Sequence, residues 1–123
     1  MASKRQSQVA SVIKRNFSIV LQQEGSYIYG AQALVTVTNV LVTPDMGEAK
    51  IYLSVFNAED KQTVILEMED NMGRLKQQLA HRIRKHVRRV PSLQFFLDDT
   101  LDEMYRINEV LNRINTGETD FEV

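Results

Sequence analysis

The chain of 123 residues contains no cysteine and no tryptophan, and its five glycines and two prolines are scattered. Without cysteine it has no disulfide framework, no thiolate metal site and no cysteine nucleophile, and a reducing compartment is the default expectation. The glycines form no phosphate-cradling loop, and no Gly-x-x-Gly motif occurs. No cofactor is therefore predicted.

Long apolar runs are also absent. The first residues are polar and are not followed by an apolar segment of the signal-peptide type, and no stretch approaches the ~18 apolar residues that cross a bilayer. We therefore expect a cytoplasmic protein without a membrane partner. The length and the apolar share of 43% predict one domain over residues 1–115, expected to be a monomer, with a flexible acidic tail at 116–123.

Charge is segregated along the chain although the net charge is only −1. Residues 1–23 and 74–89 contain basic side chains and no acid, so the remainder carries a net charge of −12. Such a dipolar chain is expected to bind polyanions through its basic side. The candidate RNA-binding residues are Lys4, Arg5, Lys14, Arg15, Arg74, Lys76, Arg82, Arg84, Lys85, Arg88 and Arg89.

The first half of the chain has the pattern of a helix followed by a hairpin. Apolar residues at three- and four-residue spacing predict an amphipathic helix over 7–21, ended by Gly25. Residues 33–42 are rich in β-branched side chains and predict a strand with Val37 and Leu41 on one face. A turn at 43–47 and alternation over 49–56 predict a second, antiparallel strand.

The second half predicts helix, strand and helix. An apolar stripe runs from Val64 to Val87, and the segment Asn71-Met72-Gly73 predicts a kink or a join within it, because Asn and Gly are weak helix formers. Pro91 ends the helical region at or before Val90. Residues 93–98 predict a third strand, and 101–114 predict a last helix behind a capping box.

This order, α-β-β-α-kink-α-β plus a C-terminal helix, predicts a two-layer α+β fold. The helices are expected on one face of a three-stranded sheet, with the other face partly wet.

The segment 74–89 favours a polyanionic partner over a merely solvated helix face. No acid interrupts it, so ion pairs at i,i+4 are absent and like charges repel by a few tenths of a kcal/mol per pair. Contacts to phosphates make binding sensitive to salt. Stacking on bases is open to Tyr27, Tyr29 and Tyr52, whereas Phe17, Phe95 and Phe96 are more simply core.

No catalytic residue, metal site or small-molecule substrate is predicted. His81 and His86 lie five positions apart, which places them on different faces of a helix. Asp98 and Asp99 point apart at a strand end, where a turn or capping role fits better than paired acid–base work. A small hydrolase would need a nucleophile with a base or a metal cluster, and neither is evident.

Several ordered blocks resemble the bacterial ribosome-binding factor A family over residues 5–114. The blocks are LVTVTNV at 34–40, TPD at 43–45, AKIYLSV at 49–55, GRL at 73–75, RVPSLQF at 89–95 and DDT at 98–100. The resemblance implies a type II KH-like fold in which a kinked helix pair replaces the usual helix-Gly-x-x-Gly-helix. Here Asn71-Met72-Gly73 stands where the family typically has Ala-x-Gly.

The resemblance also implies binding to the small (30S) ribosomal subunit and its 16S rRNA during late maturation, with roles in pre-rRNA end processing and growth in the cold. The leading hypothesis is therefore a non-enzymatic ribosome assembly factor. The alternative is a protein–protein adaptor that uses the exposed sheet face or the basic helix, without binding RNA.

Overall fold

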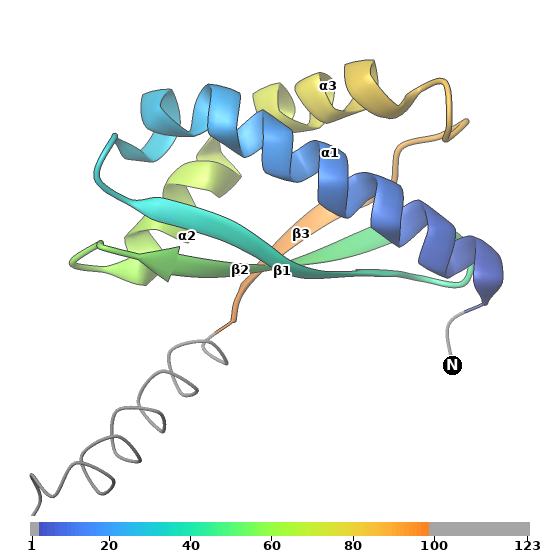
Figure 1. Ribbon diagram of the computed structural model, residues 1–123, viewed down its shortest axis with the longest axis horizontal. Coiled ribbons are helices and arrows are strands. Elements are labelled where there is room, and N and C mark those ends of the chain that lie inside the picture. The colour runs from blue at the N-terminus through green and yellow to red at the C-terminus, as the bar shows by residue number, and fades with distance from the viewer. Residues whose placement is uncertain (1–2, 99–123) are drawn as a thin grey trace, which may run out of the picture.

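Three helices cover one face of a three-stranded sheet in the computed structural model, which describes residues 3–98 (Figure 1). The elements are α1 (Lys4–Tyr29), β1 (Leu34–Val42), β2 (Glu48–Phe56), α2 (Lys61–Asp70), α3 (Met72–Ile83) and β3 (Ser92–Leu97). Helices α1 and α3 lie side by side on the sheet, and α2 lies near the carboxyl end of α1. The predicted two-layer α+β fold is confirmed, while the predicted helix at 101–114 lies outside the described residues.

Strand β2 is the centre of a mixed sheet with the order β1-β2-β3. It pairs antiparallel with β1, from Leu34 opposite Phe56 to Val42 opposite Ala49. It pairs in parallel with β3, which begins with Ser92 opposite Glu48. A parallel pair requires a long crossover, and α2 and α3 supply it.

A β-bulge in β1 changes which side chains face the helices. Strict alternation predicted Val37 and Leu41 on one face, but Val37 and Val40 are buried and Leu41 is 48% exposed. The pairing with β2 shifts between Val37 and Asn39, so Thr38 is an extra residue. An extra residue reverses the alternation of side chains beyond it. The prediction that Leu41 lies on the same face as Val37 is therefore wrong.

Helix α1 begins with a capping box. The Ser3 hydroxyl accepts from the Gln6 N–H at 3.1 Å, and the Gln6 side-chain oxygen accepts from the Ser3 N–H at 2.8 Å. The Gln6 amide also donates to the Val42 carbonyl at 2.8 Å. One side chain therefore orders the first turn of α1 and ties it to the end of β1.

The predicted end of this helix at Gly25 is wrong, because α1 continues to Tyr29 and ends at Gly30, whose φ is 92°. Gly25 is buried inside the helix, and a Cβ there would collide with the hydroxyl and ring of Tyr29. Residues four apart share a helix face, so a side chain at position 25 would require the Tyr29 ring to move. Burial raises the pKa of the Tyr29 hydroxyl above its usual value.

The core lies between the helices and the sheet. Ile13, Phe17, Ile51, Leu75 and Leu79 are fully buried, and their burial against one another stabilises the two layers by roughly 1.5–3 kcal/mol per side chain. The rings of Phe17 and Phe95 stack with centroids 5.6 Å apart, which joins α1 to β3.

Asn71 separates α2 from α3. Helix α2 ends at Asp70, and the Asn71 side chain donates to the Glu67 carbonyl at 2.9 Å, which satisfies a backbone acceptor at the end of the helix. Helix α3 begins at Met72. Gly73 is exposed in its first turn and has no atom within 4 Å of a Cβ position.

Two glycine substitutions are expected to change stability in opposite directions. Gly73→Ala should raise the free energy of unfolding by about 0.4–1 kcal/mol, because alanine reduces the entropy of the unfolded chain and meets no neighbour in the helix. Gly30→Ala should lower it by about 1–3 kcal/mol, because alanine rarely adopts a positive φ. Urea denaturation of both variants measures this, and a common sign would contradict it.

Candidate nucleic-acid interface

The basic segment is only partly helical. A helix reaching nearly to Val90 was predicted, but α3 ends at Ile83 and the chain then turns through residues 84–91 to reach β3. Seven more helical residues would carry the chain about 10 Å further along the axis of α3 and leave one residue for the return to the sheet. Pairing of Ser92 with Glu48 therefore ends the helix early. Arg84, Lys85, Arg88 and Arg89 consequently lie on a connection and not on a helix.

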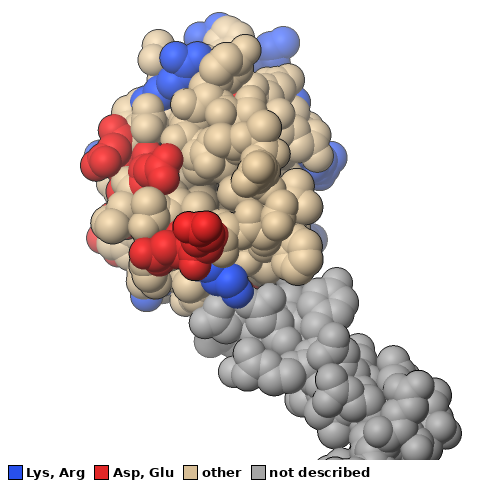
Figure 2. All heavy atoms as spheres, turned by 90° about the vertical axis from the view of Figure 1, so that its left-hand side faces the viewer, with Lys and Arg blue, Asp and Glu red and all other residues tan. Residues whose placement is uncertain are grey.

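In the described residues, the acids around α2 and the cations of residues 84–91 lie at opposite ends of the fold. Figure 2 views the end at which α2 lies, where acidic side chains gather and Lys and Arg are mostly along the margins. The loop before α2 and α2 itself contribute the acids Glu59, Asp60, Glu67, Glu69 and Asp70. The start of α1 and residues 84–91 lie at the other end (Figure 1). Within residues 3–98, the acids around α2 therefore lie at the opposite end from the start of α1 and residues 84–91, while Asp45 and Glu48 lie at the basic end.

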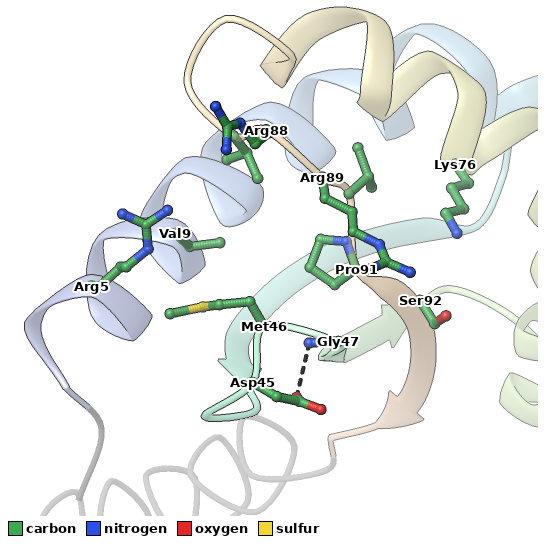
Figure 3. A pocket seen from close by; sticks show the side chains of 12 residues that line it. Arg5, Val9, Asp45, Met46, Gly47, Lys76, Arg88, Arg89, Pro91 and Ser92 are labelled. Atoms are coloured by element: carbon green, nitrogen blue, oxygen red, sulfur yellow. Dashed lines mark hydrogen bonds between the residues drawn. The ribbon is translucent and has the colours of Figure 1, made fainter.

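A hollow of about 470 Å³ at the basic end brings distant cations together. Arg5 of α1, Lys76 of α3, and Arg88 and Arg89 of the connection surround it (Figure 3). The three arginines are exposed and Lys76 is half-buried. Four positive side chains thus face one concave surface.

The rest of the lining was not anticipated from the sequence. Asp45, Met46 and Gly47 come from the turn between β1 and β2, and Ser92 comes from the start of β3; Val9, Val87, Val90 and Pro91 complete the lining. Asp45 is the one acid among these residues. The turn lies beside Ser92 because the third strand pairs in parallel with the second. The sequence alone does not give the direction of the third strand, so this contact was not predicted.

One of the predicted cations is neutralised. Arg74 forms an ion pair with Glu24 of α1 at 2.8 Å, and Glu24 is only 14% exposed. The prediction that no acid compensates this segment is therefore wrong for Arg74. The pattern at i,i+4 considers one helix alone, whereas this partner comes from the neighbouring helix.

Arg82, Arg84 and Lys85 are exposed near the carboxyl end of α3. The Arg82 Nε donates to the Asn16 side-chain oxygen at 3.3 Å, which leaves its charge unpaired by this contact. These three side chains extend the positive surface from the hollow along the end of α3.

The four N-terminal cations do not share one face. Arg5 lines the basic hollow, whereas Lys14 lines a different hollow with Asn39–Val42 of β1. Lys4 and Arg15 are exposed on α1. A helix turns about 100° per residue, so Lys4 and Arg15 point in nearly the same direction, whereas Arg5 and Lys14 lie on opposite sides of α1.

Aromatic side chains lie away from the basic hollow, since none is among its lining residues. Tyr27 is 83% exposed near the end of α1, and Tyr52 stacks on Phe96 with ring centroids 5.3 Å apart. The interpretation of Phe96 as core is wrong, because alternation in β3 buries Leu93 and Phe95 and leaves Phe96 38% exposed. The hollow therefore suits phosphates better than stacked bases.

The histidines and the acid at the end of β3 form no reactive cluster in the described part of the chain. His81 and His86 are exposed, and within residues 3–98 no three His, Asp or Glu side chains gather closely enough to hold a metal ion. The Asp98 carboxylate accepts a hydrogen bond from the Thr38 hydroxyl at 2.6 Å, which is a structural tie to β1, and Asp99 lies outside the described residues. None of the helices between residues 3 and 98 has the length and apolar character needed to span a bilayer.

Comparison with known proteins finds ribosome-binding factor A both as a family model and among individual relatives. The family model described as ribosome-binding factor A matches residues 5–111. A ribosome-binding factor A of Cytophaga hutchinsonii is 34% identical over 114 residues, which cover 93% of this chain and 85% of that protein. The relative in Chlorobium luteolum is 34% identical over 119 residues, covering 96% and 98%.

The fold agrees with a solved structure of the same family. The crystal structure of ribosome-binding factor A from Thermus thermophilus superposes with a TM-score of 0.62 at 22% identity, covering 75% of this chain and 94% of that one. At this identity the likeness shows the fold alone.

The turn that lines the hollow contains a carboxylate whose acidity can be tested. The Thr43 hydroxyl and the Gly47 N–H donate to Asp45 at 2.7 and 2.9 Å, and they hold the pKa of this carboxyl below its usual value. The ionised Asp45 carboxylate stabilises the turn at pH values above its usual pKa. This stabilisation is lost as the pH falls through the lowered pKa of Asp45. Thr43→Val should therefore raise the pKa of Asp45, as measured by NMR titration of its carboxyl carbon.

The matched control is Thr36→Val, at an exposed position of β1 that pairs with Ser54, far along the strand from this turn. It should leave the pKa of Asp45 unchanged. An equal shift in both variants would show that the Thr43 hydroxyl is not the cause.

Proposed function

The chain belongs to the ribosome-binding factor A family, and from this premise we propose that it binds the small ribosomal subunit and contacts 16S rRNA with its basic end. A model of the Thermus thermophilus protein, similar to this chain with a TM-score of 0.58 at 24% identity, was fitted into a cryo-electron microscopy map of a complex with the 30S subunit. The superposition of the two covers 80% of this chain and 96% of the Thermus chain. The family and that complex support a ribosome-binding role for this chain.

The observation that carries the proposal is the hollow surrounded by Arg5, Lys76, Arg88 and Arg89. Arginine binds phosphate oxygens in a bidentate manner, and lysine binds them as a point charge. Because the hollow gathers cations from α1, α3 and the connection, it fits a folded phosphate backbone better than a flat charged surface would. The exposed Arg82, Arg84 and Lys85 are proposed to extend this contact. Lys4, Lys14 and Arg15 lie outside the hollow and are proposed to add attraction at longer range.

The protein is proposed to act by binding alone, without making or breaking a covalent bond. The protein binds an immature subunit more tightly than a mature one, and this difference in affinity stabilises one conformation of the rRNA. Processing of pre-rRNA ends during late maturation is then carried out by nucleases that gain access, and growth in the cold depends on the same step. The protein acts as a cytoplasmic monomer without a cofactor, and the Asn71-Met72-Gly73 join sets the angle at which α3 meets the RNA.

Charge reversal at the hollow tests this proposal. Arg5→Glu combined with Arg88→Glu should weaken binding to purified small subunits and reduce the slope of log affinity against log salt by roughly 0.7–0.9 for each phosphate that the variant no longer binds. Co-sedimentation at several salt concentrations measures both quantities. Lys50→Glu combined with Lys61→Glu is the matched control, because it makes the same change in net charge away from the hollow.

The control pair should retain nearly the original slope. If both pairs behave alike, net charge and not the hollow governs binding. If the Arg5 and Arg88 pair still binds with the original slope, the basic end is not the contact, and the protein–protein adaptor becomes the better explanation.

A further inference from the structure

The sheet face that α1 and α3 do not cover has large apolar side chains. Leu34 is 58% exposed, Leu41 48% and Phe56 61%, and Phe96 is 38% exposed beside Tyr52. Within residues 3–98 these four are the majority of the large apolar side chains that remain exposed; Tyr27 and Leu66 are the others.

The pairing of the strands shows that these residues share one face. Leu34 lies opposite Phe56, and Tyr52 lies opposite Phe96. In β2 the residues Ala49, Ile51, Leu53 and Val55 face the helices and are buried. Their neighbours in β2 therefore point to the other side, and the open face of the sheet is defined by Leu34, Leu41, Tyr52, Phe56 and Phe96.

The last described residue, Asp98, is tied to the sheet by two hydrogen bonds. The Asp98 N–H donates to the Leu53 carbonyl at 2.7 Å, and the Asp98 carboxylate reaches across β2 to the Thr38 hydroxyl of β1. Figure 1 shows the end of β3 passing to the side of the sheet away from α1 and α3. Asp98, the last residue that the structure describes, is therefore held beside Leu53 and Thr38 of the sheet.

The sequence that follows has an apolar side of suitable length. Thr100 and Glu103 have the spacing of a capping box. The apolar residues after Thr100 recur at helical spacing and are Leu101, Met104, Ile107, Val110, Leu111 and Ile114. A helix of 14 residues is about 21 Å long, and a strand of nine residues spans about 30 Å. An isolated helix of this length is marginal in water, so it needs a surface on which to bury its apolar side.

We propose that residues 101–114 form an amphipathic helix that packs on the open face of the sheet, over Tyr52 and Phe96. The chain would then have helices on both faces of its sheet. This occupant is favoured over a second protein because it is tethered at Asp98, which gives it a high effective concentration at the face. The inference is independent of the proposed function, but it would close the surface that a protein–protein adaptor would use.

Paramagnetic broadening in the full chain tests this packing. Since the chain lacks cysteine, Glu109→Cys provides a unique site for a spin label on the polar side of the predicted helix. The label should broaden the amide signals of Thr36, Tyr52 and Gln94, which lie in the strands below the open face. It should leave the amide of Gln77, exposed on α3 on the opposite side, unaffected.

Variants of the segment separate packing from folding, because they leave residues 3–98 unchanged. Adding Ile107→Asp to the labelled chain should abolish the broadening, since it puts a carboxylate into the apolar stripe. Asn112→Asp, outside the stripe, adds the same carboxylate and should preserve the broadening. Unchanged amide shifts in α1 and α3 would verify that both variants are folded.

Two results would overturn the proposal. One is the absence of broadening on the open face in the labelled full chain. The other is broadening that appears only between molecules, when isotope-labelled chains without a spin label are mixed with spin-labelled chains. That second result would assign the face to another copy of the protein.

Discussion

Parallel pairing of β3 with β2 is the constraint from which the arrangement of the basic end follows. It requires the chain to cross from one end of the sheet to the other through α2 and α3, and then to descend to Ser92. The Ser92 N–H donates to the Gly47 carbonyl at 2.9 Å, so the connection meets the turn between β1 and β2. The start of α1 lies beside the same turn. Cations from separate parts of the sequence meet because this one pairing brings their backbones together.

Concentrating like charges at one end opposes folding, and the structure limits this repulsion. Arg74 is neutralised by Glu24, while the cations around the hollow remain largely in water, where repulsion is screened. The acids on α2 lie at the other end of the molecule, too far away to neutralise the hollow. Residues 3–98 therefore concentrate positive charge around the hollow although the net charge of the chain is only −1, and such a concentration favours approach to a polyanion from that side.

Periodicity predicted the order and type of the elements because burial of one face determines both. It failed where a contact with another element decided the outcome. Gly25 suggested the end of a helix, but it lies inside α1 against the ring of Tyr29. The extra residue Thr38 could not be predicted, because it is defined only by the pairing of β1 with β2. The end of α3 depends on where β3 begins. In the same way, the sequence identified the basic residues of the hollow, but neither their gathering around Arg5 nor the compensation of Arg74 could be inferred from one segment at a time.

The amide of Gln6 has a consequence for the residue that precedes it. Gln6 is 8% exposed, closes the capping box of α1 and is anchored to the Val42 carbonyl, so the backbone of Arg5 is fixed from two directions. Ordering a flexible side chain on association costs roughly 0.5–1.5 kcal/mol, and a rigid backbone leaves only the rotamers of Arg5 to be restricted. One buried amide thus fixes the backbone of Arg5 on folding, so that an anion held by this side chain would restrict its rotamers alone.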